Sequence, residues 1–242
     1  MKTKVIVIFS TNRKEYEQKK FRKEIDNSIG LKKDLYQIIV YDNHGDVSLT
    51  QAYNYAWNAL TIQDKELSDY ILVFCHHDIH FKTKGWGKNL LNIYNNNEVD
   101  IIGLAGTDTL YNHGVWWLDD TGKLTKKNLW GKVWHTDSKK EWKSDFTADK
   151  KSEKLQPVVA IDGVFMVVNP TTCFKFDEDF DGFHYYDISF CVDNFLFGKK
   201  IAVTETIQIV HESGGVLSEA WEKSREKLVY IYEKNLPIKI HK

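Results

Sequence analysis

The sequence has few cysteines, and they form no recognisable site. Cys75, Cys173 and Cys191 are the only three in 242 residues, and no CxxC pair occurs. Widely spaced cysteines in odd number argue against a disulfide framework or a cysteine-rich zinc site. They are typical of free, mostly buried thiols in a reducing compartment.

Long apolar runs and an excess of charge are also missing. The apolar stretch within residues 1–9 is too short for a signal peptide, and no later run could span a bilayer. We therefore expect a soluble, cytoplasmic protein. The 33 basic and 34 acidic residues leave a net charge of -1, which argues against a nucleic-acid partner. Hydrophobic residues make up 42% of the chain, enough for a sizeable core.

Apolar runs alternate with helical stretches over the first hundred residues. Such alternation predicts a parallel sheet with right-handed crossovers, and hence an α/β fold with a Rossmann-like half. The predicted strands cover 4–9, 36–41, 71–75 and 100–105, and the predicted helices cover 14–28, 51–60 and 87–95. Ser48 or Thr50 is the expected cap of the second of these helices.

The second half of the sequence is less regular. We expect short antiparallel strands at 115–118 and 129–134, a strand over 158–168 interrupted at Asp162, a last strand at 201–210, and helices over 186–197 and 218–234. Tryptophans in a loop region can belong to the core, form a homo-oligomer contact or stack on sugar faces. The segment 111–156 contains Trp116, Trp117, Trp130, Trp134 and Trp142.

Residues 70–81 read Y-I-L-V-F-C-H-H-D-I-H-F, a buried-strand pattern that ends in three histidines and an aspartate. If the strand continued, His76, Asp78 and His80 would share one face, with His77 opposite. Open α/β sheets bind ligands at the carboxyl ends of their parallel strands. This stretch is therefore a candidate ligand or metal site.

Polar residues follow the other predicted strands as well. They are Ser10 to Arg13, Asp42 with Asn43, and His211. Because carboxyl ends of parallel strands share one edge, these residues can meet the histidines in one cleft, which would fit a nucleotide.

The order of these motifs resembles a family 2 type glycosyltransferase of the GT-A fold. The most similar branch is bacterial, with a third strand ending in H-x-D and a later G-F-H-x-Y-D segment, here Gly182 to Asp187. The resemblance runs from Val5 to Gly215. It implies a mostly parallel central sheet flanked by helices, with a smaller antiparallel acceptor-side portion. We expect a single domain, 1–242, with a nucleotide-binding half (1–106), an acceptor half (107–215) and a C-terminal helix (216–242).

The resemblance also implies roles on the nucleotide side. In the family, the loop after the first strand and the acidic residue after the second strand hold the base and ribose. Ser10 and Asp42 take those places here, with Asn43 nearby. Read without the resemblance, Ser10 simply ends a strand and Asp42-Asn43-His44-Gly45 is a good turn sequence.

A D-x-D motif after the third strand holds a divalent metal in the family, and the matching letters here are His76-His77-Asp78. Asp78 is the expected metal ligand, and His211 matches the family's later metal or diphosphate histidine. His76 stands where an aspartate is usual, so His76 and His77 are expected beside the nucleotide sugar, and a second role of His76 as a metal ligand stays open. The implied cofactor is Mn²⁺ or Mg²⁺, and carboxylate with imidazole suits Mn²⁺ somewhat better. An aspartate at a strand end can also be a plain turn former.

Two further carboxylates complete the implied mechanism. Asp162 matches a residue that shapes the acceptor and donor-sugar pocket, and Asp187 matches the catalytic base. The family's second acidic residue, two positions on, is Ser189 here, which leaves Asp181 and Asp193 as alternative bases. Asp187 could equally be a first-turn acid stabilised by the helix dipole.

These roles together imply a metal-assisted, inverting transfer of sugar from a nucleoside diphosphate sugar, UDP-linked, to a glycan or glycolipid acceptor. A glycolipid acceptor would bring the chain to a membrane surface as a peripheral protein. A sugar nucleotidyltransferase is the first alternative, although Ser10 to Arg13 lacks the glycines of its phosphate loop. A hydrolase built on the strand's histidines and a non-catalytic carbohydrate-binding protein also remain open.

Overall fold

The structure is a computed structural model that describes residues 1–62, 67–137, 139–147, 150, 154–213 and 217–240. Gly214 and Gly215, which belong to the motif that the resemblance matched, lie outside these residues. Within the described ranges, every helix is too short or too polar to cross a membrane.

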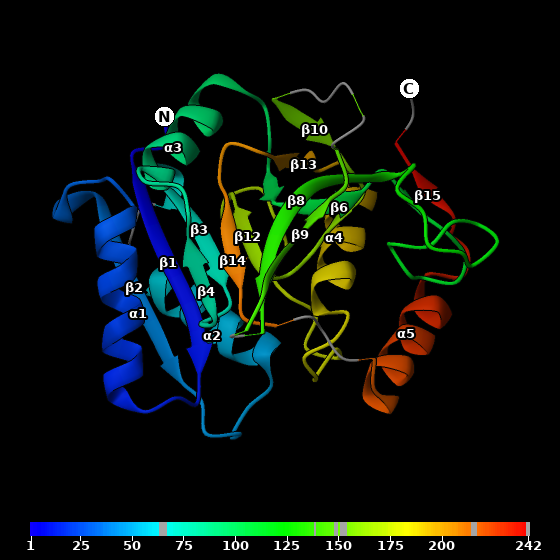
Figure 1. Ribbon diagram of the computed structural model, residues 1–242, viewed down its shortest axis with the longest axis horizontal. Coiled ribbons are helices and arrows are strands. Elements are labelled where there is room, and N and C mark those ends of the chain that lie inside the picture. The colour runs from blue at the N-terminus through cyan, green and yellow to red at the C-terminus, as the bar shows by residue number, and fades with distance from the viewer. Residues whose placement is uncertain (63–66, 138, 148–149, 151–153, 214–216, 241–242) are drawn as a thin grey trace.

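A mostly parallel sheet of seven strands forms the centre of the molecule (Figure 1). In spatial order the strands are β10 (Leu155–Pro157), β13 (Ile201–Thr204), β5 (Ile101–Gly103), β12 (Phe165–Val168), β3 (Tyr70–Cys75), β1 (Lys4–Thr11) and β2 (Tyr36–Asp42). Strand β3 is parallel to β1, and β1 to β2, whereas β12 runs antiparallel to both of its neighbours, β3 and β5. Strand β13 is parallel to β5.

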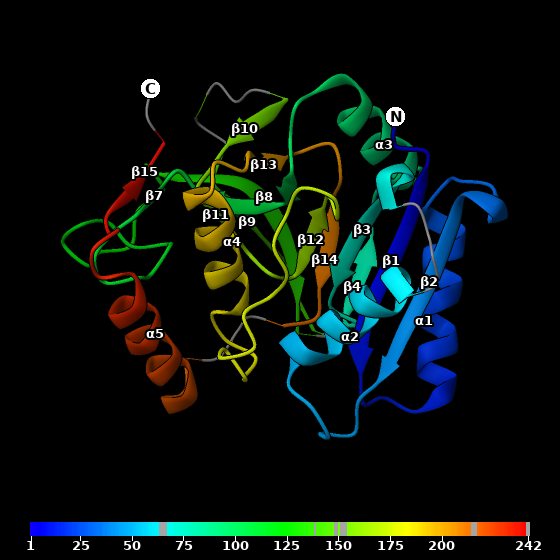
Figure 2. The ribbon, with the colours of Figure 1, turned by 180° about the vertical axis from the view of Figure 1, so that it is seen from behind.

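Helices cover both faces of this sheet (Figures 1 and 2). The helices are α1 (Glu15–Ser28), α2 (Leu49–Ile62), α3 (Trp86–Asn96), α4 (Tyr186–Leu196) and α5 (Glu219–Tyr232), with 3₁₀ turns at Lys33–Leu35 and Leu67–Asp69. The register pairs Ile8 with Phe74, so Phe9 and Phe74 point to opposite faces. Phe9 packs edge-on against Phe21 of α1, and Phe74 packs against Trp57 of α2.

Capping side chains fix the starts of two helices. The Ser48 hydroxyl accepts a hydrogen bond from the Gln51 N–H at 3.2 Å, and the Gln51 side chain accepts one from the Ser48 N–H at 3.0 Å. This reciprocal box starts α2, as the sequence predicts. Ser218 caps α5 by accepting from the Trp221 N–H at 3.2 Å. Helix α5 lies at the opposite end of the molecule from α1 (Figures 1 and 2).

A second, smaller sheet contains parts of two stretches that the sequence predicts as single strands. The strands predicted at 100–105 and 201–210 each split in two, because the chain leaves the main sheet at Leu104 and again after Thr204. The second sheet contains β11 (Ala160–Ile161), β6 (Ala105–Thr107), β8 (Leu129–Thr136), β14 (Ile209–His211) and β4 (Ile79–Phe81), with β9 (Glu141–Asp145) paired to β8.

The least regular segment is only partly as expected. The strand predicted at 129–134 is confirmed as β8, but residues 115–118 form turns with one isolated bridge, Leu118 to Leu124, so that prediction was wrong. Val115 and Trp116 are buried without a ladder partner, and burial rather than strand pairing accounts for their apolar character. Close to the C-terminus, β15 (Ile238–Lys239) pairs with β7 (Thr109–Leu110).

Gly131 allows the second sheet to bend against the first. Its φ is +88°, and a Cβ built there would lie 2.0 Å from the Leu104 carbonyl oxygen.

We expect Gly131→Ala to lower the free energy of unfolding by about 3 kcal/mol, combining left-handed strain with overpacking. Gly122 also has a positive φ, +77°, but open space around it, so Gly122→Ala should cost about 1 kcal/mol. Urea unfolding of both variants measures the difference, and equal losses would contradict the close approach.

Candidate functional site

The strand register brings the predicted site residues to one edge of the main sheet. Strands β1 and β2 run in register up to Thr11 and Asp42, and β3 ends beside them at Cys75. Because β12 runs the other way, its amino end reaches the same edge, where the His76 N–H donates to the Val164 carbonyl at 3.1 Å. Asp162 and Gly163 therefore lie next to the end of β3.

A cavity of about 800 Å³ opens at this edge. Its walls come from the loop after β1, the loop after β2 with the start of α2, the end of β3 and the loop before α4. The lining residues in these four segments are Ser10 to Asn12, Asn43 to Leu49 with Gln51 and Tyr53, His76 to Asp78, and Asp181 with Phe183.

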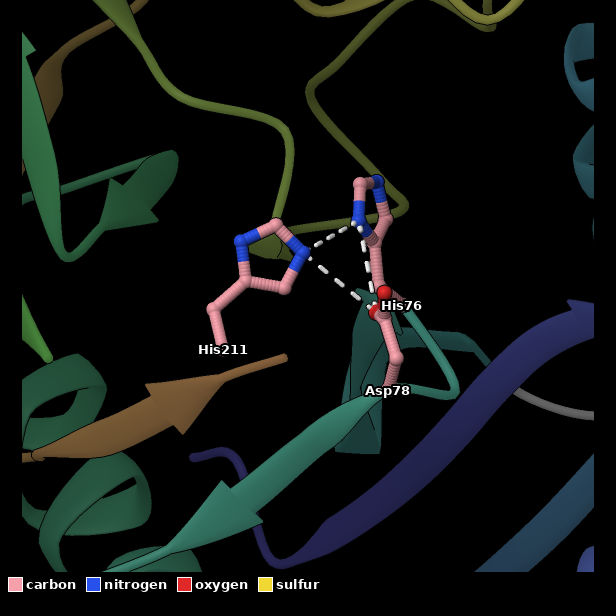
Figure 3. Close-up of side chains that lie close together, drawn as sticks. All are labelled: His76, Asp78 and His211. Carbon is pink, nitrogen blue, oxygen red and sulfur yellow. Dashed lines mark hydrogen bonds and ion pairs between the residues drawn. The ribbon is translucent and has the colours of Figure 1, made fainter. Parts of the chain in front are cut away.

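Three side chains converge where β3 ends (Figure 3). His76 Nδ1 lies 3.4 Å from His211 Nε2, which lies 3.4 Å from Asp78 Oδ1, and the third distance, His76 Nδ1 to Asp78 Oδ1, is 3.8 Å. His211 arrives from the other end of the chain because β14 pairs antiparallel with β4, with His211 opposite Ile79. Two imidazole nitrogens and a carboxylate oxygen thus face one point.

Tyr186 fixes which nitrogen of His76 carries the proton. The Tyr186 hydroxyl donates to the Gly163 carbonyl at 3.0 Å, so its oxygen accepts from His76 Nε2 at 3.0 Å. His76 Nε2 must therefore be protonated, which leaves the lone pair of Nδ1 directed at Asp78 and His211. Such orientation of a ligand imidazole by a neighbouring polar group is usual in metal sites.

The charges of the cluster suit a divalent cation. Burial raises the pKa of Asp78, but the His211 and His76 rings outweigh it and hold the pKa below its usual value, so Asp78 is ionised at neutral pH. Burial lowers the pKa of His76, so its ring is neutral there. Asp78 Oδ1 is buried and pairs with His211 Nε2 at 3.4 Å. Burial lowers the pKa of His211, but the Asp78 carboxylate outweighs it and raises that pKa. A divalent cation at this point would displace the proton of His211 and meet the Asp78 carboxylate and the lone pair of His76.

The other two histidines of the strand lie outside this cluster. The chain turns at His77 and Asp78 instead of continuing as a strand, so strict alternation does not hold. His77 Nδ1 donates to the Ser10 carbonyl at 3.2 Å. His80 lies between Glu24 and Glu212, which raise its pKa to about 9. Among the described residues, only His76, Asp78 and His211 form a group of three able to hold a metal. A metal-dependent hydrolase built on this strand would need further ligands, and these residues contain no second such group.

Asp187 lies in the first turn of α4, next to Tyr186. Its Oδ2 accepts from the Gly163 N–H at 2.7 Å and its Oδ1 from the Ile188 N–H at 2.9 Å. Burial, together with the negative charge of Asp162, raises the pKa of Asp187 to about 7. A carboxylate that exchanges its proton near neutral pH is suited to general base catalysis. Asp162 Oδ1 accepts from the Val164 N–H at 2.9 Å and shapes the turn between β11 and β12.

The alternative carboxylates differ in position. Asp193 lies farther along α4, where it accepts from the Tyr232 hydroxyl at 2.7 Å. Neither Asp193 nor Asp187 is among the residues that line the cavity. Asp181 lines the cavity. Ser189, at the place of the expected second acid, is buried and donates to the Tyr186 carbonyl at 3.2 Å.

The predicted nucleotide ligands are only partly brought together. Ser10 and Asn43 line the cavity. The Asn43 side chain holds the following loop by accepting from the Gly45 N–H at 3.0 Å and donating to the Val47 carbonyl at 2.9 Å. The Asp42 side chain is 54% exposed and accepts from Gln18 Nε2 at 3.1 Å. Asp42 does not line the cavity, so its role as a nucleotide ligand stays a prediction.

The tryptophans of the irregular segment serve mainly in packing. Trp116 is buried, Trp117 packs against Trp221 of α5, and Trp130 Nε1 donates to Asp108 at 2.9 Å. Trp142 stacks on His135, whose ring centroid is 6.1 Å from that of His211.

Sequence reasoning missed Tyr186 and Gly163. A Cβ on Gly163 would lie 2.2 Å from the Tyr186 hydroxyl oxygen, so only glycine allows this approach. Both residues adjoin predicted ones, Asp187 and Asp162, and Tyr186 is also the tyrosine of the G-F-H-x-Y-D motif, but neither was assigned a role. The contact between them depends on the reversed direction of β12, which local sequence does not reveal.

Comparison with known proteins agrees with the fold. The similar solved structures include GalNAc-T7 with UDP, GalNAc and Mn²⁺ (TM-score 0.51, 11% identity) and the mannosyltransferase PcManGT from Pyrobaculum calidifontis with GDP-Man and Mn²⁺ (TM-score 0.53, 12% identity). They match 95% and 98% of this chain, which spans only 48% and 65% of theirs. No curated protein matches the sequence.

These likenesses confirm the α/β, GT-A fold. The sequence itself matches the family described as "Glycosyltransferase like family" over residues 5–232, nearly its whole length. The resemblance inferred from the H-x-D and G-F-H-x-Y-D motifs is therefore confirmed. The chain belongs to this glycosyltransferase-like family.

Proposed function

We propose that the chain transfers a sugar from a nucleoside diphosphate sugar to a hydroxyl of a glycan or glycolipid, with inversion at the anomeric carbon. The observation that carries the proposal is the convergence of His76, Asp78 and His211 beside the cavity. His76 is hydrogen-bonded to Tyr186, the residue that directly precedes the proposed base Asp187. Family membership and the GT-A fold support the same reaction class.

Asp78, His211 and His76 would hold Mn²⁺, or less readily Mg²⁺. When bound, the cation supplies a Lewis acid that offsets the charge developing on the departing diphosphate. The similar structures carry Mn²⁺ with UDP in one case and with GDP-Man in the other. They support a nucleoside diphosphate donor, and we propose UDP as its nucleotide. Ser10, Asn43 and His77 line the cavity that would take it.

Asp187 acts as the base in the proposed reaction. The acceptor oxygen attacks the anomeric carbon while its proton passes to the Asp187 carboxylate, and the bond from that carbon to the diphosphate breaks, with the electron pair leaving on the nucleotide. Burial and the neighbouring Asp162 make this carboxylate more basic than an exposed one. Attack from the face opposite the leaving group gives inversion.

The setting of the reaction is also a proposal. A glycolipid acceptor would require peripheral association with a membrane, and the cysteine usage of the sequence suits the cytoplasm.

Removal of a metal ligand should abolish cation binding. We expect Asp78→Asn and His211→Ala to weaken Mn²⁺ binding by more than about 100-fold, because loss of a direct ligand exceeds the 10- to 100-fold effect of losing an outer partner. Electron paramagnetic resonance titration measures free Mn²⁺, and UDP release measures turnover. Asp34→Asn, which removes an exposed carboxylate on another part of the chain, is the control. Unchanged Mn²⁺ affinity in both ligand variants would contradict the site.

Loss of the base should separate binding from turnover. We expect Asp187→Asn to retain nucleotide and Mn²⁺ binding while turnover falls by about 10²- to 10⁴-fold. Since the base must be ionised and its pKa is about 7, wild-type turnover should rise with pH through a midpoint near 7. Nuclear magnetic resonance of the product tests for inversion.

A pH profile without this limb, or a product of retained configuration, would refute the role of Asp187 as the base. Nucleotide binding without any donor consumption would indicate a non-catalytic binding protein.

A further inference from the structure

His80 is one of the two histidines of the H-H-D-x-H stretch that lie outside the metal cluster. Its Nδ1 lies 2.9 Å from Glu24 Oε2, and its Nε2 lies 2.6 Å from Glu212 Oε1. Ionised carboxylates only accept hydrogen bonds, so both ring nitrogens donate and the ring is an imidazolium. His80 thus joins two carboxylates that come from distant parts of the chain.

Both carboxylate residues are tied to the strands that carry the metal ligands. Glu24 belongs to α1, and its second oxygen accepts from the Phe81 N–H of β4 at 2.8 Å. Glu212 directly follows the ligand His211, and its N–H donates to the carbonyl of the ligand Asp78 at 2.9 Å. The His80 ring therefore fixes the end of β14 to β4, and β4 to a helix.

We propose that His80 is a positioning residue that holds His211 and Asp78 at the separation a cation requires. Strand β14 is short, Ile209–His211, and its backbone pairs with β4 and β8 up to His211. The contact of the Glu212 side chain with His80 adds a side-chain link to β4 just past this last paired residue. A shift of this end would change the 3.4 Å separation of His211 Nε2 from Asp78 Oδ1. The proposal deepens the proposed function, on which it rests, by naming what preorganises the metal ligands.

The same contacts reach the nucleotide side of the cavity. Glu212 Oε2 lies 3.3 Å from Arg13 Nη2, and the Arg13 N–H donates to Thr11 Oγ1 at 3.1 Å. Thr11 and Asn12, which precede Arg13, line the cavity. Glu212 thus connects His80 with the loop after β1.

A purely structural role for His80 makes a different prediction. The ring is 42% exposed, and ion pairs of such exposure contribute little to overall stability. A structural role would change thermal stability and leave cation affinity alone. A positioning role changes cation affinity while stability without the cation stays nearly constant.

The test uses the full chain and measures Mn²⁺ affinity by electron paramagnetic resonance, together with thermal unfolding in EDTA. We expect His80→Gln to weaken Mn²⁺ binding by about 10- to 100-fold, with the unfolding temperature in EDTA nearly unchanged. Glu212→Gln removes the same link from its other end and should give a similar loss, and the double variant should lose little more. Lys82→Gln, which breaks a neighbouring ion pair with Glu141 (2.7 Å), is the matched control and should bind Mn²⁺ normally.

The outcomes distinguish the two proposals. Failure of the wild type to bind Mn²⁺ overturns both. Binding by the wild type and equally tight binding by His80→Gln overturns the positioning role alone. A large fall in the unfolding temperature of His80→Gln in EDTA, with Mn²⁺ affinity kept in the folded fraction, would assign His80 a structural role and also overturn it.

Discussion

The close approach of Gly163 to the start of α4 is the constraint on which both parts of the site depend. With no side chain in the way, the Gly163 N–H reaches Asp187 and its carbonyl accepts from Tyr186. The first contact holds the proposed base, and the second directs the His76 lone pair toward Asp78 and His211. One peptide turn between β11 and β12 therefore orients the proposed proton acceptor and a proposed cation ligand at once. The reversed direction of β12 is what delivers this turn to the edge where the parallel strands end.

The parts of the fold that local pattern predicts are those governed by local physics. The strands of the first half, the Ser48 cap of α2 and the helix that contains Asp187 follow from apolar runs, β-branched residues and capping side chains. The splitting of 100–105 and 201–210 between two sheets does not follow from them. Each is one apolar stretch in the sequence, and the exchange of partners at Leu104 and after Thr204 is decided by tertiary packing. Tertiary packing also explains Val115 and Trp116, which are apolar because they are buried and so give a strand-like pattern in the sequence.

The candidate site shows the same division. Asp78 and His211 could be named because each follows a strand-like run and matches a motif, and the structure brings them together. Strand alternation groups His76, which joins the cluster, with His80, which does not, because the chain turns where alternation would continue. Contacts over long separations decided each case: Tyr186 for His76, the Ser10 carbonyl for His77, and two glutamates for His80. Asp42, predicted by analogy, lies outside the cavity lining.

The separation of the metal ligands along the chain has a consequence for folding. His76 and His211 are 135 residues apart in the sequence, so the unfolded chain presents no preformed cation site. Closing so long a loop costs chain entropy, which the contacts of the folded state must offset. A cation bound only by the folded chain adds RT ln(1 + [L]/Kd) to stability, about 2.7 kcal/mol at a hundredfold excess over Kd. The cofactor of the proposed reaction would thus also stabilise the contact between two distant parts of the chain. Its cellular concentration would help set how much of the protein is folded.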